Sequence, residues 1–254
     1  MRAFIQCNKH FDLITESEKL EPINPNVFNA FYGLKDMGFE CIFFETYDDL
    51  IDYRHSRSEI ICGGLGTIKR RLEDFGISTD EINYPEELKK YLHRDIWTSM
   101  MNVVANSPDY WPVFVKSVEG KKLTGKVISN IGDLVGCGYC DEDYPVICSN
   151  PLNIISEYRV FVRYGKVLDM KHYSGDWSVV PDTTVIKNTI EDYTTCPDSY
   201  GIDFGITDSG ETVLIEVNDA YAIGCYGLQA HYYAKFLLTR WAQLTDTPDE
   251  YFYI

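Results

Sequence analysis

Strand-like and helix-like segments alternate over roughly the first 80 residues of the chain. Short apolar runs are separated by longer segments, such as the one that Asn26 can cap and that Gly38 can end. Alternation of this kind predicts a small α/β unit. The expected strands are Arg2–Cys7, Glu40–Glu45 and Ile60–Cys62, and the expected helices are Asn26–Met37 and Thr67–Phe75.

The pattern changes in the rest of the chain, where strands and hairpins follow one long helical segment. That segment, Pro85–Met101, predicts a helix that leads towards a second domain. We therefore predict an α/β domain at residues 1–88 and an α+β domain at residues 89–254. The elements expected after the helix are strands at Pro112–Lys116, Val127–Ser129 and Val146–Cys148, hairpins at Glu157–Tyr173 and Tyr200–Asn218, and a helix at Gln229–Leu244.

The hairpin at Tyr200–Asn218 carries the strongest chemical signal. If Ser209 and Gly210 form a two-residue loop, Asp203 lies directly opposite Glu216. Asn218 shares their face because side chains two residues apart on a strand point the same way. The side chains expected on the opposite, buried face are Ile202, Phe204, Ile215 and Val217.

Two carboxylates that face each other across a ladder repel, so we expect a cation between them. Mg²⁺ prefers hard oxygen ligands from one or two carboxylates together with substrate phosphates. The spacing therefore favours a Mg²⁺ site at Asp203, Glu216 and Asn218. The alternatives are a solvated hairpin face, or a register that differs by one residue and separates the two carboxylates.

Basic residues follow the preceding hairpin. Glu157, Arg159 and Arg163 alternate onto one strand face, and Lys171 falls opposite Arg159 if the turn takes three residues. Arginine and lysine beside a Mg²⁺ site suit triphosphate chemistry, because they offset the charge that develops on the phosphates. The alternative is an ordinary cross-strand ion pair of Glu157 with Arg159 or Lys171.

Composition and charge exclude several classes of function. The 254 residues are 45% apolar and carry a net charge of −16, so general binding to nucleic acid or to anionic membranes is disfavoured. The sequence has no apolar run long enough to span a membrane and no secretory signal. Eight cysteines without an export signal are typical of reduced thiols, and we expect a cytoplasmic location.

Two further motifs favour structural interpretations. Cys137 and Cys140 have the spacing of a metal or redox pair, and Cys148 adds a third thiol, but a zinc site needs four ligands. Incidental loop thiols are the favoured interpretation. The glycines at 63, 64 and 66 follow a strand and open a helix, yet the third glycine of the dinucleotide fingerprint is missing. A tight turn between strand and helix is favoured there.

The order of several short motifs resembles the ATP-grasp superfamily. These motifs are, in sequence, LHRDIW, PVFVKS, KKLTG, PVICS, EYRVFV with GKV, YGIDFG and IEVND. The resemblance covers roughly residues 90–225 and is greatest to a compact bacterial and phage clade with an EYRVFV-type hairpin. The α/β unit before it resembles the small pre-ATP-grasp domain. The strand lysine, the arginine hairpin and the D…ExN set are fairly specific in this order, although each piece alone is weak.

The resemblance implies that two α+β subdomains clasp ATP and Mg²⁺. It also implies ligase chemistry, in which a carboxylate is joined to an amine or similar nucleophile through an acyl phosphate. By position, Lys116, Arg94 and Arg159 match residues that contact the phosphates, with Arg94 replacing a lysine, and Lys171 lies beside them. The other matches are Ile147 and Cys148 at the adenine hinge, the loop Ser117–Gly125 over the phosphates, and the Mg²⁺ ligands Asp203, Glu216 and Asn218.

The substrate is left open at this stage. The hinge segment PVICSNPLN lacks the acidic residue that holds the ribose in many family members. Free amino acids, a peptide terminus and a side-chain carboxylate are all compatible acceptors, and Tyr221–Tyr226 either lines the acceptor side or packs on the last helix. Two other functions share the ATP site. One is a nucleotide-binding interaction protein without ligase activity, whose acidic surface serves a basic protein partner, and the other is phosphotransfer to an acceptor that is not a carboxylate.

Overall fold

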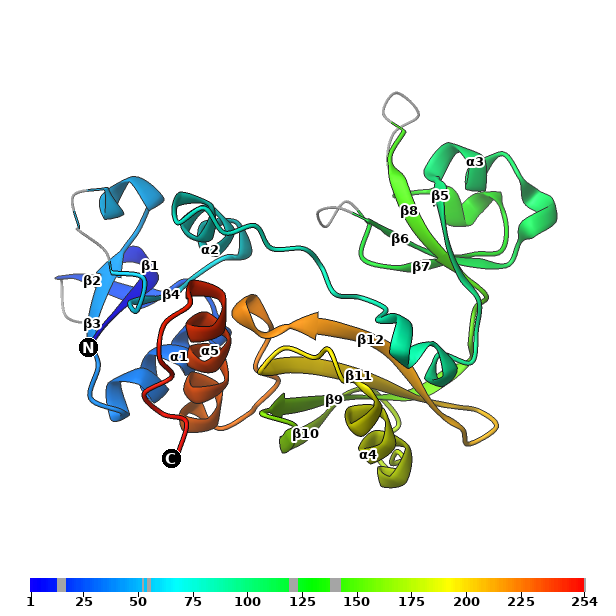
Figure 1. Ribbon diagram of the computed structural model, residues 1–254. Coiled ribbons are helices and arrows are strands. Elements are labelled where there is room, and N and C mark those ends of the chain that lie inside the picture. Colours follow the sequence, from blue (N-terminus) through cyan, green and yellow to red (C-terminus); the bar gives the residue numbers. More distant parts are fainter. Residues whose placement is uncertain (13–16, 52, 54–55, 119–122, 138–142, 254) are drawn as a thin grey trace.

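The computed structural model describes residues 1–12, 17–51, 53, 56–118, 123–137 and 143–253. Over these residues the chain forms three four-stranded sheets, which lie side by side in Figure 1 with helices packed around them. Within the same residues, no helix combines the length and the apolar character needed to cross a membrane. The mixture of helices and separate sheets confirms the α+β fold class.

The first sheet has the predicted α/β pattern. A central strand, β1, pairs in parallel with β3 and β4, and β2 extends it as an antiparallel partner that the sequence did not predict. Asn24, rather than Asn26, caps the first helix through its side chain. The elements are β1 (Arg2–Asp12), β2 (Ser17–Pro22), α1 (Pro25–Asp36), β3 (Glu40–Phe44), η1 (Tyr47–Leu50), β4 (Ile60–Cys62) and α2 (Leu65–Asp74).

The core of this sheet is shared with the last helix of the chain, α5 (Ala230–Thr245). Buried residues between Ala3 and Leu72 pack in one cluster with buried residues between Ala220 and Trp241. The helices α1 and α5 lie against each other (Figure 1). Their contact requires a glycine, because a Cβ atom at Gly33 would lie 2.0 Å from the carbonyl oxygen of Ala230.

The second sheet has the order β10-β9-β11-β12. One of its faces packs on α4 and η2 in a separate apolar core. On the other face, α5 covers the end where Phe161 and Arg163 lie. Every residue of β11 is buried. The elements are η2 (Glu86–Tyr91), β9 (Ile154–Arg163), β10 (Lys166–Gly175), α4 (Thr183–Asp192), β11 (Ser199–Thr207), β12 (Thr212–Asp219) and η5 (Ala220–Ala222).

The third sheet has the order β5-β8-β6-β7 and its own small core. It stands apart from the second sheet at the upper right of Figure 1, and the two are joined through residues 150–153 between β8 and β9. The elements are β5 (Ile96–Met100), α3 (Met101–Ala105), η3 (Pro108–Tyr110), β6 (Val113–Ser117), β7 (Lys126–Ile128), η4 (Ile131–Leu134) and β8 (Pro145–Ser149).

The predicted helix at Pro85–Met101 is wrong. The segment begins with the short helix η2 and ends as β5, which pairs with β8. Between them His93 has a φ of 50°, a left-handed conformation that ends the helix. The prediction extended the helical pattern of Glu86–Tyr91 too far, because Ile96, Trp97 and Thr98 favour the strand that forms the edge of the third sheet.

The pairing of Asp203 with Glu216 is confirmed, although the turn differs from the predicted one. The turn is longer than the predicted two residues. The N–H of Thr207 donates to the carbonyl of Glu211, so residues 208–210 form the turn. A bulge in β12 offsets the extra turn residue, because Asp203 pairs with Glu216 whereas Phe204 pairs with Leu214. Leu214 therefore occupies the buried position expected for Ile215, which is half-buried.

Candidate active site

A row of charged residues crosses one face of the second sheet. Lys171 pairs with Arg159, Arg159 with Asp203, and Asp203 with Glu216, on four neighbouring strands. Direct partners in antiparallel strands project to the same face, so the row runs from two cations to two carboxylates. Lys171 lies opposite Arg159 as predicted, but the three-residue turn is wrong, because Lys166 pairs with Arg163 and a bulge between Val167 and Asp169 restores the pairing. The ammonium of Lys171 contacts Asp169 at 2.7 Å.

Arg159 and Asp203 form a buried bidentate ion pair. Arg159 Nε and Nη2 donate to the two carboxylate oxygens of Asp203 at 2.7 and 2.5 Å. The two residues are only 6% and 2% exposed. Burial raises the pKa of the Asp203 carboxyl to about 6, although Arg159 opposes this shift. A buried pair of this kind is strongly held, because each partner would be an uncompensated charge without the other.

Glycines keep this face of β11 clear on both sides of Asp203. Gly201 and Gly205 lie two residues before and after it, and so share its face. A Cβ at Gly201 would approach Ile223 to 2.3 Å, and one at Gly205 would approach Ile154 to 2.9 Å. The GIDFG sequence therefore allows neighbouring segments to close around the carboxylate.

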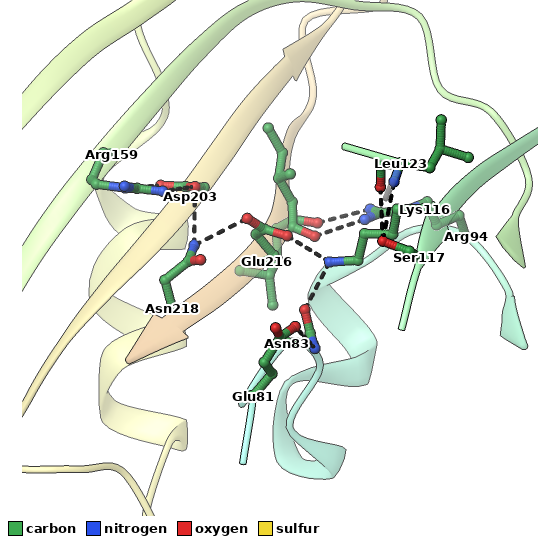
Figure 2. Close-up of polar contacts among 12 residues, drawn as sticks. Glu81, Asn83, Arg94, Lys116, Ser117, Leu123, Arg159, Asp203, Glu216 and Asn218 are labelled. Atoms are coloured by element: carbon green, nitrogen blue, oxygen red, sulfur yellow. Dashed lines mark hydrogen bonds and ion pairs between the residues drawn. The ribbon is translucent and has the colours of Figure 1, made fainter. Parts of the chain in front are cut away.

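Lys116 reaches from the third sheet to the second. Its Nζ lies 2.7 Å from Oε2 of Glu216, as Figure 2 shows. Asn218 Nδ2 donates to Glu216 Oε1 at 3.1 Å and to Asp203 Oδ2 at 3.3 Å. Burial raises the pKa of Glu216, but Lys116 and Asn218 outweigh it and hold that pKa below its usual value. In this structure the two facing carboxylates are thus each compensated by a protein cation.

The donor set suits a hard divalent cation. Asp203, Glu216 and Asn218 converge with two carboxylates and one amide, and carboxylate and amide oxygens are ligands that Mg²⁺ accepts. In this structure Asn218 turns its amide N–H towards both carboxylates, so its Oδ1 would reach a cation only after the amide rotates. Over the described part of the chain, no group of three or more histidine, cysteine, aspartate or glutamate residues could hold a metal ion. Any cation at this site therefore depends on the amide of Asn218, or on phosphate oxygens, for further ligands.

Arg94 lies next to this cluster but faces backbone. Its guanidinium, labelled in Figure 2, faces carbonyl oxygens. It donates to those of Leu92, Leu214 and Ile215 at 3.0, 2.8 and 2.8 Å. It thereby holds the bulge of β12 immediately before Glu216. Burial lowers the pKa of Arg94. The structure gives Arg94 an anchoring contact that the sequence did not predict, and its contact with phosphate stays a prediction.

The predicted hinge residues lie inside β8. Ile147 pairs with Lys116, so its side chain is on the same face of the third sheet. Cys148 points into the core of that sheet and is fully buried. The connection between the two sheets lies further on, at 150–153. An adenine contact by Ile147 and Cys148 stays a prediction, and it would have to be made from within a strand that is paired on both sides.

Other sequence candidates have structural partners. Arg163 donates to Thr239 Oγ1 at 2.7 Å and also contacts Asp249, so it anchors α5 and the segment after it. The Cys137 thiol donates to the carbonyl of Asp133, Cys140 lies outside the described residues, and all seven described cysteines are free.

Aromatic residues border the row on the side of Arg159. The ring of Tyr226 lies 4.7 Å from the guanidinium carbon of Arg159, and Tyr173 contacts the same ring at 5.0 Å. Tyr173 donates to Glu157 at 2.8 Å. Tyr221–Tyr226 also contributes Tyr221, Ala222 and Ile223 to a cavity of about 240 Å³ between the start of α1 and the end of β4. The segment packs on α5, because the Tyr233 hydroxyl donates to the carbonyl of Ile223 and Tyr221, Ile223 and Cys225 share a core with that helix, as one of the two sequence interpretations expected. A role at the acceptor side stays a prediction.

Two residues near Lys116 were missed at the sequence level. Asn83 Oδ1 accepts a hydrogen bond from Lys116 Nζ at 2.7 Å, and the ring of Tyr84 lies 4.8 Å from the same nitrogen. Both belong to the segment that connects α2 to η2. The sequence Asn-Tyr-Pro was a turn signal, because asparagine tolerates left-handed backbone and proline follows closely. Nothing in it indicated a contact with a lysine 33 positions further along the chain.

Comparisons with known proteins identify the family and the fold. The family model of the ATP-grasp domain, R2K clade family 2, matches residues 91–236. No curated protein matches the sequence. Among solved structures, the D-alanine–D-alanine ligase from Bacillus anthracis is similar with a TM-score of 0.57 and 12% identity, over 96% of this chain and 97% of that one.

A complex of the same ligase with ATP has a TM-score of 0.54 at 12% identity, over 96% and 97% of the two chains. The ATP-grasp ligase PsnB, complexed with a minimal precursor, has a TM-score of 0.53 at 12% identity, over 94% and 98%. At this identity the likenesses establish a shared fold. Because the family match covers more than half of its length, the chain belongs to the ATP-grasp superfamily, in R2K clade family 2.

Proposed function

We propose that this protein is an ATP- and Mg²⁺-dependent ligase that joins a carboxylate to an amine or similar nucleophile through an acyl phosphate. One observation carries the proposal: Lys116 of the third sheet meets the row of Arg159, Asp203 and Glu216 on the second. Cations and carboxylates from two sheets thus converge on one point between them, which is where a Mg-triphosphate would need both kinds of group.

In the proposed complex, Asp203, Glu216 and Asn218 would hold Mg²⁺, which would supply positive charge against the phosphates. Lys116 then exchanges Glu216 for phosphate oxygens. Arg159 keeps its bidentate contact with Asp203 and presents its remaining N–H groups to the transferred phosphoryl group. Lys171 and Arg94 add positive charge at the two ends of the site, and the base lies beside Ile147 and Cys148.

The reaction proposed needs no covalent nucleophile on the protein. The γ-phosphoryl group moves from ATP to the substrate carboxylate, and ADP leaves. The amine then attacks the acyl carbon, and phosphate leaves with the bonding electrons. The contribution of the described side chains is to position the reactants and to offset developing charge.

The acceptor is a small molecule or a peptide. The similar structures include a ligase named for D-alanine and one complexed with a minimal precursor, and each of these acceptor classes carries a carboxylate. The 240 Å³ cavity next to Ile223 offers room for a compact acceptor. Ile223 lines this cavity and also lies next to Gly201, so it stands between the cavity and the strand of Asp203.

The test is release of ADP and phosphate when candidate acids and amines are added with Mg-ATP. Lys116→Ala and Asp203→Asn should abolish turnover while the protein stays folded, because each removes one of the converging charges. Lys166→Ala is the matched control, since Lys166 is exposed at the hairpin turn. Wild-type rates in the two site variants would refute the site. Binding of Mg-ATP without release for any acceptor would instead favour a nucleotide-binding interaction protein.

A further inference from the structure

The segment between α2 and η2 crosses β12 at Asn83. The N–H of Val217 donates to the carbonyl oxygen of Asn83 at 2.8 Å, which forms an isolated bridge between this segment and the strand. Asn83 has a φ of 52°, in the left-handed region that asparagine tolerates better than most residues. The backbone of Asn83 is therefore fixed one residue away from Glu216, and its side chain can be aimed at the site.

The side chain of Asn83 contacts the ammonium group of Lys116. Lys116 Nζ donates to Asn83 Oδ1 and to Glu216 Oε2, both at 2.7 Å, with the Tyr84 ring 4.8 Å away (Figure 2). Asn83 Nδ2 donates to Glu81 at 3.3 Å, so the amide presents its oxygen to the lysine. Two of these three groups around the ammonium come from the connecting segment, and only Glu216 comes from the row.

We propose that Asn83 is a positioning residue that aligns Lys116 with the ATP phosphates, an inference that rests on the proposed function. When Glu216 turns to Mg²⁺, Lys116 loses its anionic partner and would regain the rotational freedom of a long side chain. Asn83 keeps one hydrogen bond to it. Because the amide is neutral, it orients the ammonium group without cancelling the charge that the phosphates need.

The hydrogen bond between Lys116 and Asn83 also connects the third sheet to the second. Lys116 is carried by β6, whereas Asn83 is bridged to β12 of the second sheet. The hydrogen bond between them fixes the lysine relative to the strand that bears Glu216 and Asn218. The connecting segment thereby becomes part of the nucleotide site.

The decisive variant is Asn83→Gly, because glycine accepts a positive φ and the carbonyl that bonds Val217 is retained. Losing one hydrogen bond to a charged group should weaken ATP binding about tenfold in an equilibrium titration with Mg²⁺. AMP lacks the β- and γ-phosphates, so its affinity should not change. In a Lys116→Met background, Asn83→Gly should weaken ATP binding no further.

Asp246→Gly is the matched control, since Asp246 is exposed, has a φ of 53° and lies at the end of α5. It should leave ATP affinity unchanged. Equal ATP affinity in the wild type and in Asn83→Gly would overturn the positioning role and leave the proposed function standing. Equal losses for ATP and AMP, or a full loss on top of Lys116→Met, would also overturn it and indicate a structural role. No ATP binding by the wild type would sink the proposed function itself.

Discussion

The strands β11 and β5 each belong to one of the two sheets that meet at the site, yet they are built very differently. All nine residues of β11 are buried, whereas none of the five residues of β5 is. The sheet of β11 has an apolar core on one face and α5 over part of the other. The carboxylates of the site thus stand on a deeply packed sheet, while the sheet of Lys116 has an edge strand without a buried residue.

The difference suggests that the two sheets have different roles at the site. Ligand geometry for a metal needs a fixed register, and a strand with a buried face has a strongly specified register. A lysine that has to exchange a carboxylate for phosphates gains from a sheet whose local opening costs less. We expect mutations to separate the two sheets clearly in stability measurements.

The largest effect should come from Phe204→Ala in β11. Phe204 is fully buried, and truncating such a residue costs about 3–5 kcal/mol of unfolding free energy through lost burial and the cavity left behind. Trp97→Ala in β5, where the side chain is 40% exposed, should cost well under half of that. Urea unfolding of the two variants gives the comparison, and similar losses would show that the two sheets are equally packed.

A slightly smaller effect is expected for Arg159→Met. It leaves Asp203 buried without its main partner, which should cost about 3 kcal/mol at neutral pH, at the low end for such pairs because Asn218 still donates to Asp203. The double variant Arg159→Met, Asp203→Leu should regain most of that stability but no ATP turnover. A double variant as unstable as the single one would mean that packing, and not the orphaned charge, determines the loss.

The smallest effect concerns the turns. Gly210 and Gly136 both have a φ of 85°, and at neither would a Cβ meet another atom within 4 Å. Replacing each by alanine should cost about 1 kcal/mol, since the strain is local to the backbone. If Gly210→Ala and Gly136→Ala lower the free energy of unfolding equally, the two regions differ in burial and not in backbone strain at their turns. A clear inequality, measured by the same urea titration, would contradict that view.

The sequence predicted the second sheet's side of the site better than the third sheet's side. Alternation and a turn signal led to the pairing of Asp203 with Glu216, although the three-residue turn and the bulge at Ile215 offset each other. The direct pairing of Asp203 with Arg159 joins strands 44 residues apart in sequence, and no local pattern encodes it. The charge row was therefore predictable within each hairpin but not between them.

On the third sheet's side, the positions of β5 and Asn83 depended on tertiary structure. The helix-favouring residues end near Leu92, whereas Ile96, Trp97 and Thr98 are common in strands, and pairing with β8 makes Ile96–Met100 a strand. Asn83 shows the same limit, because its role follows from a bridge to Val217 that is distant in sequence. The contacts that orient Lys116 and Arg94 in the structure come from long-range packing, and their phosphate contacts stay predictions.

The packing of α5 against α1 has a consequence for biosynthesis. The apolar surface of the first sheet and α1 is covered by side chains from Ala220–Trp241. The ribosome adds that segment some 150 residues after Leu72. At about 5–20 residues per second, the nascent chain exposes this surface for on the order of ten seconds. We therefore expect the nascent N-terminal portion to bind a chaperone that shields apolar surface until α5 has been synthesised.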